Sequence, residues 1–275
     1  MISMVNELLK NRLAFVGLVV IVGLLLVAIL APWIMPYDPY QQNLAHELAP
    51  PSLRHWLGSD QDGCDILSRI IYGARLSLWV ALVTVAISLV AGMVVGCIAG
   101  YYGGLADQLL MRLVDFFLAF PGILMAIAIT ALFKDPSINI VIFALCITGW
   151  VGYARLVRGQ ILAIKNNLFV EAARALGAKD SRIILIHLIP NILAPIIVET
   201  TFGLARVILA EGGLSFLGLG APPGTPSWGS MLNTGRQYML VAPHLSIYPG
   251  LAIMLVVMGF NFLGDGLRDY LDVKD

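Results

Sequence analysis

Six long apolar segments, separated by short polar or glycine-rich breaks, constrain the fold of this chain more than any other feature. The first runs through residues 13–31 without a charged side chain. As a helix it measures about 28 Å, which matches the hydrocarbon core of a bilayer. The other five lie near residues 76–98, 109–133, 138–153, 192–209 and 247–263. We therefore predict an all-α, polytopic membrane protein with about six transmembrane helices.

The composition of the 275 residues supports this fold class and excludes others. Hydrophobic residues make up 59% of the chain and charged residues 12%, and the mean hydropathy is +0.87. Soluble domains carry roughly 25% charged residues. Lys and Arg together number 17, as do Asp and Glu, so no overall positive field attracts nucleic acid. A water-soluble enzyme and a nucleic-acid-binding protein are both excluded.

The basic residues predict that both chain ends lie in the cytoplasm. The first apolar segment is longer than the core of a signal peptide and no small-residue cleavage site follows it, so we expect it to remain as a transmembrane helix. With the N-terminus inside, the cytoplasmic segments hold more basic residues than the outer ones, as the positive-inside rule requires. The inner set is Lys10, Arg12, Arg112, Arg155, Arg158, Lys165, Arg174, Lys179, Arg182, Arg268 and Lys274, and the outer set is Arg54, Arg69, Arg75, Lys134 and Arg236.

Two polar segments divide the chain. Residues 33–75 follow the first helix and should lie outside the membrane, whereas residues 155–190 should form a cytoplasmic loop. We expect residues 1–75 to form an N-terminal region with one transmembrane helix, and residues 76–275 to form a core with the other five.

The outer segments carry no recognisable metal site. Asp60, Asp62 and Asp65 are too loosely spaced for an EF-hand loop, so we expect solvated charges and local helix caps. Residues 211–246, rich in Gly and Pro, are expected to pack at the interface or re-enter the membrane. The three cysteines and four histidines are scattered, which predicts no metal site and no disulfide framework.

The cytoplasmic segment predicts two short helices. Asn166 or Asn167 can cap the first, Glu171 lies in its first turn, and Gly177 stops it. Phe169, Ala173 and Leu176 would share one face at helical spacing. The second helix would cover residues 182–188, with Pro190 ending or kinking it. Such a small element is stable mainly when docked. It is either a docking element for a partner or a surface loop in the lipid headgroup region.

The spacing within this segment follows a defined pattern. Glu171-Ala172-Ala173 is followed after three residues by Gly177, and Ile189-Pro190 lies further on. This pattern resembles the EAA loop of ABC importer permeases. His187 and Ile189 stand where that pattern has Ile and Leu, so the second half matches more loosely.

Motifs elsewhere in the chain extend the resemblance from about residue 12 to residue 272. They are His55 to Asp60, Asp65 to Arg69, Tyr72 to Arg75, Phe120-Pro121, Pro226 to Gly229 and Asn261 to Leu267. They resemble the permeases of the dipeptide, oligopeptide and nickel transport group. One departure is Cys64, which stands where the group has Arg in a Gly-Arg-Asp run.

The resemblance implies a type I ABC importer permease fold, with both ends inside, in the plasma membrane of a bacterium or archaeon. It implies a homologous second permease, two cytoplasmic ATPase subunits and an extracytoplasmic binding protein as partners, besides membrane lipid. The cytoplasmic helix would then be the coupling helix that contacts an ATPase. The expected coupling residues are Glu171, Ala172, Ala173, Leu176, Gly177 and Pro190.

This chain is expected to be a non-catalytic subunit without a cofactor of its own. It contains no GxxxxGK[ST] phosphate loop, so ATP and Mg²⁺ would bind to the partner ATPases. The expected substrates are di- and oligopeptides, with nickel or a nickel chelate as the alternative, because nickel permeases share the same motifs. A stand-alone secondary transporter is a more distant alternative, since neither paired broken helices nor internal symmetry is visible.

Four charged residues fall within the apolar segments. Arg112 and Asp115 are expected to pair along one helix face. Glu199 and Arg206, seven residues apart, either pair with the second permease or line the translocation pathway. Gly92 and Gly96 form a GxxxG spacing, which permits close approach of another helix.

Overall fold

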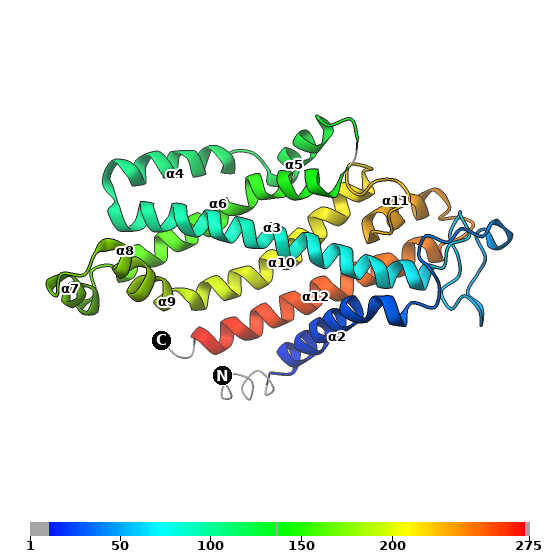
Figure 1. Cartoon of the computed structure of the whole chain (residues 1–275), viewed down its shortest axis with the longest axis horizontal. Coiled ribbons are helices and arrows are strands. Elements are labelled where there is room, and N and C mark those ends of the chain that lie inside the picture. The colour runs from blue at the N-terminus through cyan, green and yellow to red at the C-terminus, as the bar shows by residue number, and fades with distance from the viewer. Residues whose placement is uncertain (1–10, 136, 273–275) are drawn as a thin grey trace.

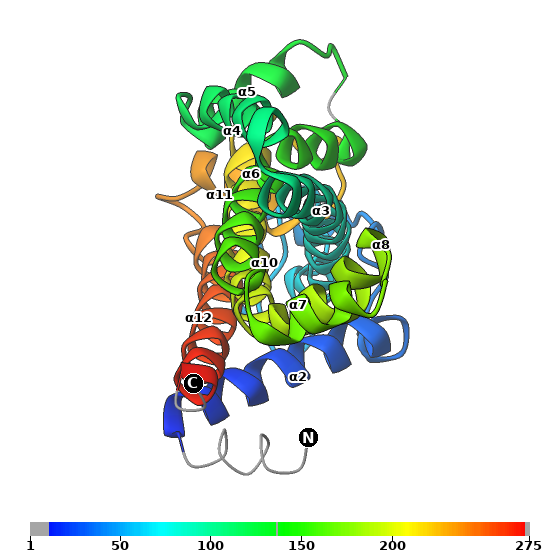
Figure 2. The same cartoon turned by 90° about the vertical axis from the view of Figure 1, so that its left-hand side faces the viewer.

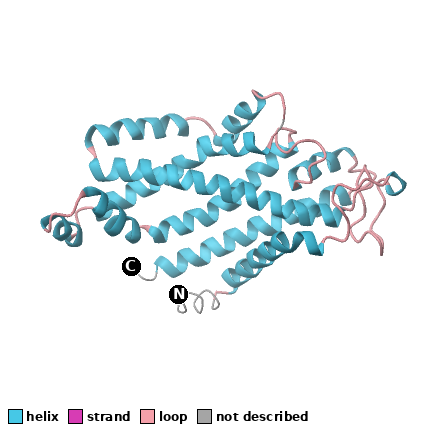
Figure 3. Cartoon of the chain, in the orientation of Figure 1, coloured by secondary structure: helices cyan, strands magenta, loops and turns pink. Residues whose placement is uncertain are grey.

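The computed structural model describes residues 11–135 and 137–272. Across these two ranges the chain is helical, with no strand beyond an isolated bridge between Ser59 and Asp65. Five helices are long and apolar enough to cross a membrane: α2 (Arg12–Ile34), α3 (Ile66–Tyr102), α6 (Ile138–Ile164), α10 (Leu193–Phe216) and α12 (His244–Asp272). Two shorter helices joined at a sharp bend make a sixth span if the pair is taken as one, and the predicted all-α membrane fold is confirmed (Figures 1 and 3).

That sixth span is broken, where the sequence predicted one continuous segment over residues 109–133. Helix α4 (Gly104–Leu118) and helix α5 (Gly122–Ala131) meet at 78°. Pro121 stands directly before α5. It supplies no backbone N–H and restricts the residue before it, so a helix cannot continue smoothly through this point.

Two other helices are longer than predicted. Helix α3 begins at Ile66 and carries its first turns into the outer region, so the expected division of the chain at residue 75 falls inside a helix. Helix α6 continues to Ile164 and takes up the first part of the expected cytoplasmic loop.

The helix directions place both chain ends on one side. The end of α12 and the short helix α7 (Leu168–Ala175) lie toward the left of Figure 1. The start of α2 lies beside the end of α12, where Asn11 Nδ2 donates to Asp269 Oδ2 at 3.3 Å. Helix α11 (Trp228–Gln237) and the segment joining α2 to α3 lie at the opposite end. This matches the predicted arrangement with both ends inside. Lys10 and Lys274, two of the basic residues behind that prediction, lie outside the described residues.

Glycines bring α3 and α6 into close contact, as the GxxxG spacing predicted. A methyl group on Gly96 would lie 2.6 Å from the Ala154 carbonyl oxygen, and one on Gly100 would lie 3.0 Å from Ile161 Cβ. Gly92 packs against Tyr153 in the same way. The two helices therefore touch through their backbones over more than two turns.

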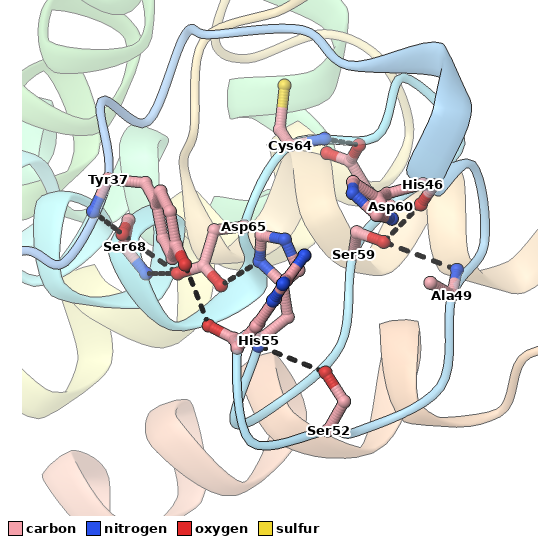
Figure 4. Close-up of polar contacts among 11 residues, drawn as sticks. Tyr37, His46, Ala49, Ser52, His55, Ser59, Asp60, Cys64, Asp65 and Ser68 are labelled. Carbon is pink, nitrogen blue, oxygen red and sulfur yellow. Dashed lines mark hydrogen bonds and ion pairs between the residues drawn. The ribbon is translucent and has the colours of Figure 1, made fainter.

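The outer segment between α2 and α3 is a packed structure, and the expectation of solvated carboxylates there was wrong for two of three residues. Asp60 is buried and pairs with Arg69. Asp65 is also buried and caps α3 by accepting from the Ser68 backbone N–H at 2.8 Å. Its other oxygen lies 3.0 Å from His55 Nδ1 (Figure 4). Local capping by this group of carboxylates was predicted, but the burial of Asp65 depends on the loop folding over it.

Cys64 lies in the same packed segment. Its side chain is buried, and its backbone N–H donates to Asp60 Oδ1 at 2.9 Å (Figure 4). Burial raises the pKa of its thiol above the ordinary value. Arg69, one turn into α3, supplies the positive partner of Asp60.

Candidate functional site

Helix α7 occupies the segment that the sequence singled out, and its end has the predicted geometry. Asn167 precedes the helix with an extended backbone, although its side chain makes no capping hydrogen bond. At the other end Gly177 has φ +79°. The Gly177 N–H donates to the Arg174 carbonyl at 3.0 Å and the Ala178 N–H to the Ala173 carbonyl at 3.1 Å. These two bonds form a Schellman motif, which needs a residue in the left-handed region.

One face of α7 is anchored in the membrane domain. Val170 and Ala173 are buried in a cluster with Val157 and Ile161 of α6. Leu176, expected to share the face of Ala173, lies beyond the last helical residue and is 89% exposed. The Leu176 N–H still makes a helical hydrogen bond to the Ala172 carbonyl at 3.0 Å. Phe169, Ala173 and Leu176 line the same hollow, as their helical spacing predicted.

The remaining predicted coupling residues lie on the surface. Glu171, Ala172 and Gly177 are exposed, together with Leu176. Beside them is a hollow of about 740 Å³, whose lining includes Phe169, Ala172, Leu176, Gly177, Arg182 and His187. Figure 2, which looks onto this end of the molecule, shows α7 lying across it.

The second half of the segment differs from the prediction. The helical run continues through α8 (Asp180–Arg182), a π-helical turn (Ile183–Leu188) and α9 (Ile189–Asn191). Pro190, expected to end or kink the helix, lies at the start of α9, directly after the π-helical turn. The break comes at Ile192, immediately before α10.

Polar contacts that sequence reasoning missed tie this region to the inner ends of α3 and α6. The Tyr101 hydroxyl of α3 donates to Asp180 Oδ1 at 2.7 Å, and the Arg174 guanidinium lies 6.0 Å from the centre of the Tyr101 ring. Lys165 Nζ donates to the Gly100 carbonyl at 3.0 Å. A displacement of α7 would therefore pull on α3.

A bidentate ion pair joins α6 to α4 at the same end. Arg158 Nε and Nη2 donate to the two Asp107 oxygens at 2.5 and 2.7 Å. The sequence signal was present, because opposite charges stand at the inner ends of neighbouring apolar segments. It could not be read without knowing that α4 and α6 touch.

The predicted pairing of Arg112 with Asp115 is wrong. Asp115 of α4 instead pairs with Arg155 of α6 at 2.8 Å. The contact between these two helices offers Asp115 a guanidinium from another element, in place of the one a turn earlier on its own helix.

Glu199 and Arg206 are brought together by the structure. They form an ion pair with each other along α10, and their side chains are 30% and 60% exposed. Arg206 lies near the middle of α10, the depth at which a charged side chain is most costly in contact with lipid.

Comparison with known proteins identifies the class to which this helical bundle belongs. Residues 92–274 match the family described as binding-protein-dependent transport system inner membrane component. Residues 3–51 match the N-terminal transmembrane domain of oligopeptide transport permease C. The chain belongs to this family of transport permeases and is a multi-pass inner membrane protein.

Similar proteins place it more narrowly, in the peptide and nickel group of ABC permeases. It is 47% identical to the dipeptide transport system permease protein DppC of Alkalihalophilus pseudofirmus over 269 residues, covering 98% of this chain and 88% of that one. It is 44% identical to the glutathione transport system permease protein GsiD of Escherichia coli, covering 96% and 88%. The counterpart from Pectobacterium atrosepticum is 42% identical, covering 98% and 89%.

A solved structure supports the fold independently. A chain of the MetNI methionine ABC transporter superposes with a TM-score of 0.60 at 20% identity, covering 74% of this chain and 97% of that one. At that identity the likeness concerns the fold alone. It agrees with the predicted ABC importer permease architecture.

Proposed function

We propose that this chain forms half of the translocation pathway of an ATP-driven importer of di- and oligopeptides, and that α7 couples it to an ATPase subunit. A homologous second permease forms the other half, and an extracytoplasmic binding protein delivers the peptide. ATP and Mg²⁺ bind to the two ATPase subunits, and this chain contributes no catalytic residue.

The proposal rests on the difference between the two faces of α7, one buried and the other exposed. One face is held in the membrane domain by Val170 and Ala173, while Leu176 and Ala172 remain exposed beside a hollow. An eight-residue helix is too short to be stable alone. Exposed apolar residues next to a hollow are typical of a surface that another protein covers. Asp180 of α8, the helix that follows α7, accepts a hydrogen bond from Tyr101 of α3, so movement of that partner would be transmitted into the bundle.

The substrate class rests on the similar proteins. The printed names of the relatives specify dipeptides and glutathione, and glutathione is itself a small peptide. Peptide is therefore the proposed substrate class, and nickel becomes one arm of the test.

The test is uptake by the complete transporter in proteoliposomes, with the binding protein outside and ATP inside. We expect a labelled dipeptide to accumulate only when ATP and both ATPase subunits are present. Accumulation of nickel without peptide would overturn the substrate assignment. Transport by this chain without ATPase subunits would overturn the ABC mechanism in favour of a secondary transporter.

A charge reversal tests the coupling surface separately. Glu171→Lys should weaken co-purification of the ATPase subunits, because it replaces an exposed acid at the start of α7 with a base. Asp135→Lys makes the same change at an exposed acid on the turn before α6 and should leave co-purification unchanged. Equal behaviour of the two variants would contradict a docking role for Glu171.

A further inference from the structure

A small hollow opens beside Arg206, between helices α3, α5, α6 and α10. Its volume is about 240 Å³, below the roughly 300–1,000 Å³ typical of sites for drug-sized ligands. It suits one end of a peptide better than a whole one. The lining includes hydroxyl groups and glycines as well as the guanidinium: Ser88, Thr148, Gly149, Tyr153, Gly203 and Arg206.

Two hydroxyl groups in this hollow are buried without a partner. Among the described residues neither Ser88 Oγ nor Tyr153 Oη makes a hydrogen bond, although both side chains are at least nine-tenths buried. The Thr200 hydroxyl near Tyr153 donates to the Ile196 carbonyl at 2.7 Å, and the Cys146 thiol near Ser88 donates to the Thr84 carbonyl at 3.8 Å. A buried hydroxyl without a partner is costly. Two of them in one hollow indicate a polar occupant.

Two glycines make room for these hydroxyls, which lie where a side chain at either position would stand. A methyl group on Gly203 would lie 2.5 Å from Tyr153 Oη, and one on Gly149 would collide with Ser88 Oγ. Any larger residue at either position would press on the hydroxyl and fill the hollow. The small residues therefore let two hydroxyl groups lie beside a hollow whose lining is otherwise mostly apolar.

Arg206 supplies the charge at the edge of this cavity. Its guanidinium carries five N–H donors, of which Nη2 donates to Glu199. With 60% of its side chain exposed near the middle of a membrane-spanning helix, it requires a hydrated or protein-covered surrounding. Guanidinium groups bind carboxylates through two parallel hydrogen bonds.

We propose that Arg206, together with the hydroxyls of Ser88 and Tyr153, binds the terminal carboxylate of the peptide inside the translocation pathway. The proposal rests on the proposed function and adds a substrate-binding residue to it. Glu199 holds the guanidinium between transport cycles, and the carboxylate of the arriving peptide replaces it. The two hydroxyls then donate to the lone pairs of the carboxylate oxygens that the guanidinium leaves free.

The test measures discrimination between a dipeptide and its C-terminal amide by the complete transporter in proteoliposomes. Both are supplied at concentrations that saturate the binding protein, so that the ratio of maximal uptake rates reports on the permease. Arg206→Gln should reduce the preference for the free carboxylate by about tenfold, the loss expected for one charge-assisted contact. Tyr153→Phe should reduce it by about fivefold, as for one neutral hydrogen bond.

Arg155→Gln is the matched control. It also removes the arginine of an exposed ion pair within the bundle, with Asp115, but Arg155 does not line the hollow. This variant should keep the wild-type preference. Arg206→Lys, which keeps the charge, should retain part of the preference that Arg206→Gln loses.

Two outcomes would overturn the binding role of Arg206, and a third would overturn the proposed function. An unchanged preference in Arg206→Gln, with the complex intact, would show that Arg206 does not contact the carboxylate. Loss of co-purification with the second permease in Arg206→Gln would assign this residue to the subunit interface and overturn the binding role. Failure of the wild-type complex to transport any peptide would overturn the proposed function instead.

Discussion

Substitution of Gly177 by asparagine separates the conformational role of this residue from its role in docking. Gly177 has φ +79°, and a side chain built on it would meet no atom within 4 Å. The cost of replacing it is therefore limited to backbone strain, about 1–2 kcal/mol for an ordinary residue. Asparagine is several-fold enriched in this region and costs less. Burial of Val170, worth about 1.5–3 kcal/mol, should keep α7 docked.

If an ATPase subunit covers this turn, the asparagine side chain enters space that the partner needs. We expect Gly177→Asn to fold, to lose ATPase co-purification and to lose ATP-driven peptide uptake. Gly104→Asn provides the control, because Gly104 also has a positive φ of 57° and open space around its Cβ. Wild-type uptake by Gly177→Asn would refute the reasoning, since it would show that nothing packs against the end of α7.

Three further predictions concern the bundle itself. Gly96→Leu should lower the thermal unfolding temperature, because Gly96 touches α6 and overpacking costs about 1–3 kcal/mol. Gly159→Leu should leave that temperature unchanged, because no atom lies near the Gly159 Cβ position. Equal unfolding temperatures of the two variants would contradict the contact. Arg158→Asp should destabilise the protein in detergent, and the added change Asp107→Arg should restore about 1 kcal/mol; a double variant no better than the single one would show that the pair contributes nothing. Cys64 is 2% exposed and should react slowly with maleimide at pH 8, because burial raises the pKa of its thiol and lowers the thiolate fraction. Labelling as fast as in the unfolded chain would contradict its burial.

Features encoded by neighbouring residues were predictable from the sequence. The apolar segments predicted the spans, because their length must match a bilayer, and the basic residues predicted the direction of the spans. The end of α7 at Gly177 followed from the backbone freedom of glycine. The contact made by Gly92 and Gly96 followed from the absence of side chains there.

Features that depend on distant elements were not predictable. Asp115 had an arginine on its own helix, and only the packing of α4 against α6 gave it Arg155 instead. The burial of Asp60 likewise depends on the outer segment folding against Arg69. The hollow beside Arg206 is lined by residues from four helices, so no local sequence pattern predicts it.

The bend at Pro121 is a different case. The residue pair Phe120-Pro121 was visible in the sequence, and its physical consequence is local. A continuous apolar run nevertheless suggested a single helix. Proline interrupted the helix at this point, although the segment is apolar on both sides of it.

The most direct test of the account is the accessibility of Leu176 from either side of the membrane. A single cysteine is placed at position 176 after the three native cysteines have been replaced, and a membrane-impermeant thiol reagent is added to right-side-out or inverted vesicles. We predict labelling only in inverted vesicles, and protection when the ATPase subunits are bound. Labelling from the outer side, or labelling that bound ATPase subunits do not affect, would contradict the assignment of α7 as the coupling element.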